Sequence, residues 1–227
     1  MATPKKKSDR RGQPAGFTPG EARELFRRLA SARPEPRTEL HYTDPYTLVV
    51  AVALSAQATD VSVNKATKEL FKVADTPAKM VELGEDGVAG YIRTIGLWRN
   101  KAKNVVALSR IILEQHGGRT PRTREDLEAL PGVGHKTASV VLNEAYGEPT
   151  IAVDTHVFRV SNRTGLAPGS TPEKVERRLQ EVTPEEYKRG AHHWLILHGR
   201  YTCLARKPAC PGCVIRDLCR YEAKTGE

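Results

Sequence analysis

Four cysteines near the end of the chain are the clearest set of residues that could do chemistry. The chain of 227 residues contains 4 Cys, and all of them follow residue 200. Their spacing is Cys-x6-Cys-x2-Cys-x5-Cys, and Pro208, Pro211 and Gly212 let the segment turn tightly. Four thiolates this close in sequence can surround one zinc ion or one iron–sulfur cluster, and spacing alone does not decide between them. The sequence therefore predicts an inorganic centre held by Cys203, Cys210, Cys213 and Cys219.

A lysine directly after a glycine-rich turn is the second candidate. Residues 130–136 read Leu-Pro-Gly-Val-Gly-His-Lys and separate two stretches with helical periodicity, 123–130 and 136–146. Proline and glycine interrupt a helix, so we expect a helix, a hairpin and a second helix. Backbone N–H groups at the start of the second helix can bind an anion such as a DNA phosphate, with Lys136 beside it. An ordinary turn with an exposed lysine is the alternative that this stretch alone leaves open.

An aspartate lies at the start of a further helix. Residues 148–153 read as an extended segment, and Asp154 can cap a helix that runs to about Arg163. Taken by itself, this capping role is sufficient to explain the residue. Three histidines further along offer nitrogen ligands, but the cysteines already complete a ligand set, so we expect packing and interface roles for His192, His193 and His198.

Composition limits the classes of protein. The formal net charge of +9 and the pI of about 9.5 favour a polyanionic partner, with simple solubility as the alternative. No apolar run is long enough for a transmembrane helix. The clustered cysteines and the lack of a signal peptide argue against a disulfide-bonded secreted domain and for a reducing compartment. Residues 1–17 are basic and nearly free of apolar side chains, which predicts a disordered tail.

The elements that must position these residues are helices. A capping residue followed by proline marks a helix start, and this pair recurs at Thr18-Pro19, Asp44-Pro45, Thr76-Pro77, Thr171-Pro172 and Thr183-Pro184. The valine-rich run 48–54 resembles a strand, but its Asp-Pro start and the absence of a partner strand favour a buried helix. The sequence therefore predicts an all-α protein with about ten short helices.

The motifs in combination resemble the endonuclease III family of DNA repair glycosylases. They are the hairpin 130–136, Val153-Asp-Thr-His156, the run His192–Arg200 and the four-cysteine segment. The resemblance extends from about residue 20 to the C-terminus. It implies a six-helix barrel domain with the helix-hairpin-helix over residues 39–149, and a helical iron–sulfur domain from residues 18–38 plus 150–227. The active-site cleft of the family lies between two such domains, and its metal centre is one 4Fe–4S cluster rather than zinc.

The resemblance also implies a bifunctional enzyme that removes oxidised pyrimidines from duplex DNA and cleaves the abasic site by β-elimination. The catalytic lysine and aspartate of the family fall on Lys136 and Asp154. Only the neutral amine is nucleophilic, and lysine has an unperturbed pKa of about 10.4. A position at a positive helix end and partial desolvation would favour the neutral form. His156 is expected to orient the active site.

Further residues would contact DNA by the same resemblance. Gln57 would fill the gap left by the flipped nucleotide and Leu97 would wedge into the opposite strand. From the sequence alone, Gln57 could be an ordinary polar loop residue, and core packing is the better explanation of Leu97. Phosphate contacts are expected from Gly132, Val133, Gly134, His135, Arg200, Arg206 and Lys207. Departures from the usual family pattern are His135 for arginine, Ser139 for asparagine and Trp98 for tyrosine, which bear on phosphate contact and lesion preference.

The partner expected from these features is double-stranded DNA containing damaged bases or abasic sites, bound by a monomer. We expect a cytoplasmic, nucleoid-associated protein of a prokaryote. Two other readings stay open at this point. A non-catalytic protein could use the hairpin and the metal centre only to recognise distorted duplexes, and a monofunctional mismatch glycosylase would release a base without cutting the strand.

Overall fold

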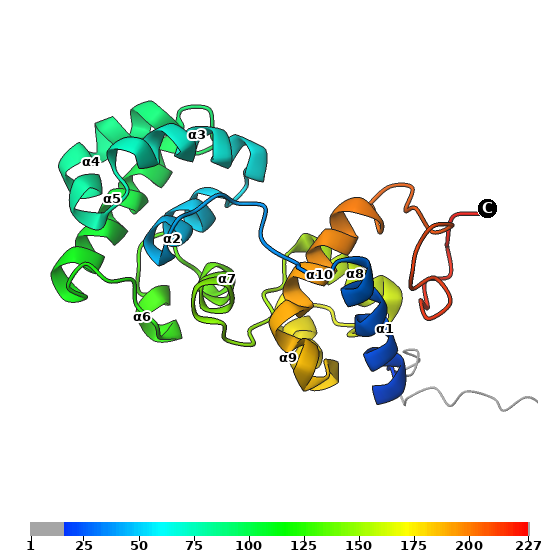
Figure 1. The fold of residues 1–227 in the computed structure, drawn as a ribbon. Helices are drawn as coiled ribbons and strands as arrows, with labels where there is room; N and C mark the ends of the chain where they lie inside the picture. The colour runs from blue at the N-terminus through cyan, green and yellow to red at the C-terminus, as the bar shows by residue number, and fades with distance from the viewer. Residues whose placement is uncertain (1–15, 227) are drawn as a thin grey trace, which may run out of the picture. The chain divides into compact units, whose positions relative to one another are not determined.

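The computed structural model describes residues 16–226, and nearly all of the predicted basic tail lies outside them. Within this range the chain forms ten α-helices and one 3-10 helix and contains no strand, which confirms the all-α prediction. Phe17, the last residue of the predicted tail, is instead buried, at 8% exposure. None of the described helices combines the length and the apolar character needed to cross a membrane. The helices divide into two compact units (Figure 1).

The middle unit spans Arg37–Glu148. Its helices are α2 (Pro45–Leu54), α3 (Asp60–Val73), α4 (Pro77–Ile92), α5 (Trp98–Gln115), α6 (Arg124–Glu128) and α7 (His135–Tyr146). Every residue of α2 after its first proline is buried, and α2 contacts α3, α5 and α7 (Figure 1). A helix that is apolar on all sides has to be surrounded by others. The valine-rich run is therefore the central helix of this unit.

The terminal unit combines the described part of Met1–Pro36 with Pro149–Glu227. Its helices are α1 (Pro19–Ala32), α8 (Thr155–Thr164), α9 (Pro172–Val182), the 3-10 helix η1 (Glu185–Tyr187) and α10 (Lys188–Tyr201). Chain segments far apart in sequence meet here, because α10 packs against both α1 and α8 (Figure 1). The rings of Phe26, Tyr187 and Trp194 form an aromatic cluster with centroid separations of 5.8 to 6.4 Å. These apolar contacts join the N-terminal helix to the C-terminal part.

Four of the five predicted capping pairs begin α-helices, at Thr18, Asp44, Thr76 and Thr171. The fifth prediction is wrong. Thr183 is the C-cap of α9, and its hydroxyl is buried without a hydrogen-bond partner among the described residues. Pro184 has an extended ψ of 144°, so no helical turn brings the backbone of Glu186 to that hydroxyl. Glu186 instead pairs with Arg23 at 3.0 Å, and the next α-helix begins only at Lys188.

Candidate active site and metal centre

The hairpin between α6 and α7 contains one residue with left-handed backbone, Gly132, a conformation that few residues other than glycine adopt easily. Gly132 has a φ of +79°, and a Cβ at this position would lie 3.0 Å from the side-chain Nδ2 of Asn104. The N–H of Val133 donates to the carbonyl of Leu130 at 3.0 Å, which closes the turn. Gly134 is the N-cap of α7 and has no side chain to bond the first N–H groups of the helix. The start of α7 is therefore suited to bind an anion.

Lys136 is the second residue of α7, in the first helical turn as predicted, and its side chain is exposed. The partial desolvation expected for this amine from the sequence is therefore not seen in the described structure. The position of Lys136 directly beyond the hairpin places its amine next to any phosphate that the hairpin binds.

Two of the residues that depart from the family pattern are linked through one arginine. Arg124 of α6 donates from Nη1 to the hydroxyl of Ser139 at 2.9 Å. The same Nη1 lies 3.3 Å from Nδ1 of His135, and this ring nitrogen lies 3.0 Å from the carboxylate of Glu128. Sequence reasoning did not identify Arg124 or Glu128. Their contacts hold His135 against α6 at the hairpin, so its ring is less available to a phosphate than its exposed position suggests.

Asp154 is the N-cap of α8, which confirms its predicted capping role. Its Oδ1 accepts hydrogen bonds from the backbone N–H groups of His156 and Val157, both at 2.8 Å. Its Oδ2 lies 3.1 Å from Nδ1 of His156, and the side chain of Asp154 is 13% exposed. The positive end of α8 stabilises the negative charge of this carboxylate. The geometry therefore provides one oriented carboxylate with a histidine beside it.

The extended segment before Asp154 is held from α10. Ile151, Ala152 and Val153 are buried, and Nδ1 of His192 lies 2.8 Å from the carbonyl oxygen of Ala152. The three histidines of α10 are all buried, and the ring of His193 packs edge-on against that of His192 at 4.8 Å. Their placement fits the predicted packing role. It also gives His192 a role that the sequence did not suggest, which is to fix the backbone that leads to Asp154.

Gln57 and Leu97 occupy neighbouring loops of the middle unit. Both are non-glycine residues with left-handed backbone, with φ values of 54° and 60°. A Cβ on Gly96 would lie 3.8 Å from the carbonyl oxygen of Gln57, so the two loops touch. Gln57 is exposed, and Leu97 is 59% exposed, which excludes core packing as its reason. Left-handed backbone at non-glycine residues costs free energy and is concentrated at functional sites.

The four cysteines share one neighbourhood. Burial raises the pKa of the Cys213 and Cys219 thiols, and negative charge on the other cysteines raises it further. A positively charged inorganic centre would reverse that repulsion and favour the thiolates. No group of described side chains is close enough to hold a single metal ion. Four thiols in one short segment match the ligand set of an iron–sulfur cluster, in which each thiolate binds a different iron.

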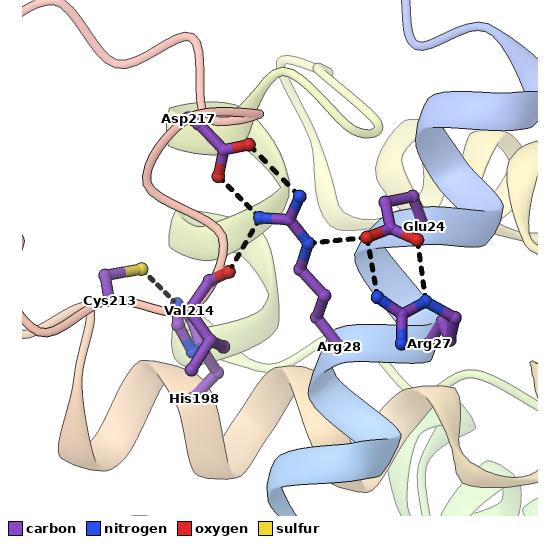
Figure 2. Close-up of polar contacts among 7 residues, drawn as sticks. All are labelled: Glu24, Arg27, Arg28, His198, Cys213, Val214 and Asp217. Atoms are coloured by element: carbon purple, nitrogen blue, oxygen red, sulfur yellow. Dashed lines mark hydrogen bonds and ion pairs between the residues drawn. The ribbon is translucent and has the colours of Figure 1, made fainter.

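The segment around the cysteines is held by arginines from the helical core. Arg163 of α8 donates to the carbonyls of Leu204 and Ala205 at 2.6 and 2.9 Å, and its Nη1 lies 3.7 Å from Sγ of Cys203. Arg28 of α1 bonds Val214 and Asp217, between the last two cysteines, and Nε2 of His198 of α10 lies 3.7 Å from Sγ of Cys213 (Figure 2). The predicted phosphate contacts Arg206 and Lys207 are exposed, with Lys207 at a φ of 49°, and Arg200 is partly buried.

Comparisons with known proteins agree with this arrangement. Residues 50–185 match the HhH-GPD superfamily of base excision DNA repair proteins, and residues 203–219 match the iron–sulfur binding domain of endonuclease III. Endonuclease III of Escherichia coli strain K12 is 61% identical over 201 residues, which cover 88% of this chain and 95% of the relative. Endonuclease III of Treponema pallidum is 56% identical, with coverage of 86% and 92%.

Solved structures show the same fold. An endonuclease III trapped in a covalent intermediate with DNA aligns with a TM-score of 0.84 and 42% identity, covering 90% of this chain and 96% of the other. A thermostable thymine-DNA glycosylase aligns with a TM-score of 0.80 and 25% identity, with coverage of 89% and 96%. The iron–sulfur match agrees with the chemistry of the four thiols, so the metal centre is a 4Fe–4S cluster. From its sequence identity, its fold and its cluster domain, the chain belongs to the endonuclease III family of base excision DNA repair proteins.

Proposed function

We propose that Lys136 and Asp154 carry the chemistry of this base-excision-repair DNA glycosylase and abasic-site lyase, acting on oxidised pyrimidines in duplex DNA. The observation that carries the proposal is the exposed amine of Lys136 in the first turn of α7, directly beyond the Gly132–Gly134 hairpin. A base inside the duplex cannot be attacked, so the damaged nucleotide has to be flipped out. The hairpin N–H groups bind a phosphate of that strand and bring the everted sugar to Lys136.

Lys136 acts as the nucleophile in its neutral form. Its Nζ forms a bond to C1′ of the sugar as the glycosidic bond breaks, and the departing base takes the electron pair and a proton. Loss of the amine proton and opening of the sugar ring yield a Schiff base between Nζ and C1′. Removal of a C2′ proton then expels the 3′ phosphate by β-elimination, and water hydrolyses the Schiff base to regenerate the lysine. DNA binding supplies the desolvation that favours the neutral amine.

Asp154 stabilises the positive charge that develops on the sugar and accepts the proton that Lys136 loses. Its support is the fixed position of its carboxylate, because two backbone N–H groups bind Oδ1 and His156 lies against Oδ2. A carboxylate held in this way needs little reorganisation during the reaction. Lys136 belongs to the middle unit and Asp154 to the terminal unit, so the proposal requires both units to engage the same nucleotide.

The wedge residues are Gln57, which fills the gap in the lesion strand, and Leu97, which enters the opposite strand. Their exposure and left-handed backbone support these roles. Arg200, Arg206 and Lys207 contribute phosphate contacts, with a smaller part for His135 because Glu128 and Arg124 already engage it. The protein acts as a monomer on damaged double-stranded DNA and associates with the nucleoid.

The cysteines Cys203, Cys210, Cys213 and Cys219 ligate the 4Fe–4S cluster, which stiffens the basic segment between them and takes no part in the reaction. Purified protein should be yellow-brown and contain about four iron and four sulfide per chain. A colourless protein holding only zinc would contradict this assignment.

Borohydride trapping tests the role of Lys136. Reduction of the Schiff base should join the parent protein covalently to abasic-site DNA, and Lys136→Ala should abolish the adduct while Lys103→Ala, which removes an exposed lysine of α5, should not. Trapping by Lys136→Ala at the parental level would refute the assignment. Release of the free base without strand cleavage would instead indicate a monofunctional glycosylase, and binding without either product would indicate a non-catalytic protein.

A further inference from the structure

An arginine of the N-terminal helix reaches the segment between the last two cysteines. Nη1 and Nη2 of Arg28 donate to the two carboxylate oxygens of Asp217 at 2.6 and 3.1 Å. Nη1 also donates to the backbone carbonyl of Val214 at 3.1 Å. Val214 and Asp217 both lie between Cys213 and Cys219, and Figure 2 shows the guanidinium group filling the space between this loop and α1. A single side chain thus binds the loop at two points.

Arg28 is itself held in place from α1. Its Nε donates to Glu24 at 2.7 Å, so every edge of the guanidinium group has a partner (Figure 2). The backbone of α1 cannot easily shift, because Leu25, Phe26 and Leu29 are buried in the core of the terminal unit. The side chain of Arg28 is 28% exposed and that of Asp217 is 64% exposed, so solvent screens their charges and the restraint comes from the bidentate geometry and the added bond to Val214. Arg28 therefore holds the loop at a fixed position relative to α1.

The loop has few other contacts with the helical core along this stretch. Cys213 is approached from α10 by Nε2 of His198, at 3.7 Å from Sγ. Local turns include the bonds from the Cys213 N–H to Cys210 and from the Cys219 N–H to Ile215. At the end of the loop, Sγ of Cys219 lies 3.8 Å from the carbonyl oxygen of Arg163, and the N–H of Arg220 donates to the carbonyl of Thr164 at 3.0 Å. Ile215 is fully buried and packs into the core. Local turns shape the loop but do not attach it to the helices. Attachment comes from buried Ile215, from the contacts of Cys213 with His198 and of Cys219 with Arg163, and from Arg28, which bonds the exposed residues Val214 and Asp217.

We propose that Arg28 is a positioning residue for the iron–sulfur cluster, and that α1 acts as a clasp on the loop that carries Cys213 and Cys219. With the clasp in place, both thiols stay at the cluster and exclude competing ligands. Without it, the loop opens more often, and each opening exposes two thiolate–iron bonds to water, chelators and oxidants. The N-terminal helix then controls how long the cluster is retained. This inference depends on the cluster and is independent of the roles proposed for Lys136 and Asp154.

Cluster release from the holoenzyme tests the clasp. Arg28→Met keeps the aliphatic stem and removes all of the hydrogen bonds, whereas Arg27→Met is the matched control, because Arg27 pairs with Glu24 but makes no contact with the loop. Visible absorbance of the cluster is followed in excess iron chelator, with iron content measured at the end. We expect Arg28→Met to lose the cluster about tenfold faster than the parent, and Arg27→Met to match the parent within about twofold.

A second variant separates the clasp from a general loss of folding. Asp217→Asn removes the same bidentate ion pair by changing the partner of Arg28, and it should also accelerate release of the cluster. The double variant should release the cluster more slowly than the two single effects combined would predict, because both substitutions remove the same ion pair. Helical circular dichroism before chelator is added should equal that of the parent. Equal release rates for the parent, Arg28→Met and Asp217→Asn would overturn the proposal, as would equal acceleration by Arg27→Met.

Discussion

Gly199 of α10 lies directly against His156 of α8, because a Cβ on Gly199 would be 2.8 Å from the Cβ of His156 and 3.2 Å from Cγ2 of Val160. Both neighbours belong to the helix that Asp154 caps. The carbonyl of Gly199 also accepts a hydrogen bond from Arg159 at 2.8 Å. The missing side chain of Gly199 therefore allows α10 to support the start of α8, and with it the carboxylate of Asp154.

Gly199→Ala should displace the start of α8. The added methyl group has no room, and overpacking of this kind costs about 1 to 3 kcal/mol. We expect base release to fall about tenfold or more, since a small shift of an oriented catalytic group is sufficient for such a loss. Single-turnover base release measures the effect. Gly90→Ala in α4 is the control, because a Cβ there meets nothing within 4 Å.

Asp154 caps α8 and also acts in catalysis in the proposed mechanism, and two substitutions should separate these roles. Asp154→Asn keeps an oxygen to cap α8 but removes the charge, so stability should change by less than about 1 kcal/mol while base release falls by about 100-fold or more. Asp154→Ala loses the cap as well and should destabilise the protein by a further 0.5 to 2 kcal/mol, roughly. Chemical denaturation and single-turnover kinetics give the two readouts. Full activity of Asp154→Asn would remove Asp154 from the mechanism.

The hairpin glycines should respond differently to alanine. Gly132→Ala places a methyl group on a left-handed backbone and against Asn104, so we expect a loss of about 1 to 2 kcal/mol in stability and weaker DNA binding. Gly134 has a φ of −96° and open space around it. Gly134→Ala should therefore fold normally with a change below about 1 kcal/mol. Anisotropy of a labelled duplex with a stable abasic-site analogue measures binding, and equal behaviour of the two variants would contradict this reading of the hairpin.

Leu97 should show a conflict between stability and function. Leu97→Gly relieves the left-handed backbone and should leave the protein as stable as the parent or more stable, by up to about 1 kcal/mol. It should nevertheless slow lesion removal from duplex DNA, because the wedge is gone. Cleavage of an abasic site in single-stranded DNA, which needs no wedge, should be unchanged. Loss of activity on both substrates would show that Leu97 acts in some other way.

We expect the buried amine of Lys101 to lower the free energy of unfolding. Its amine is buried without a hydrogen-bond partner among the described residues, the residue is 7% exposed, and burial lowers its pKa. Lys101→Met should therefore raise the free energy of unfolding by about 1 kcal/mol at neutral pH.

The pH dependence of this effect has a definite sign. Below the unfolded pKa of about 10.4, the unfolded chain holds the proton of Lys101 more tightly than the folded chain does. The parent should therefore gain stability relative to Lys101→Met as pH rises through the lowered pKa toward that value. Thermal unfolding at a series of pH values tests this, and a less stable Lys101→Met variant would show that the amine has a stabilising partner.

Local chemistry explains why so much was predictable from the sequence. A helix start depends on a capping side chain and a proline within a few residues, so Thr18, Asp44, Thr76 and Thr171 marked real helices. The prediction at Thr183 was wrong because this residue ends α9 and Pro184 after it keeps an extended ψ of 144°, so no helical turn follows directly. The hairpin and the four-cysteine ligand set could also be predicted, since each is complete within one short stretch of sequence.

The sequence by itself determined the all-α class, most helix starts, the four-thiol segment and the place of Lys136 and Asp154 at the beginning of their helices. Only the tertiary structure decided that Gly199 supports His156, that Arg124 joins His135 to Ser139, and that Arg28 holds the loop of Cys213 and Cys219. Backbone hydrogen bonds and caps act over a few residues and leave a pattern in the chain. Contacts such as that between Arg28 and Asp217, which are 189 positions apart, arise only when buried faces pack, and no local pattern records their partner.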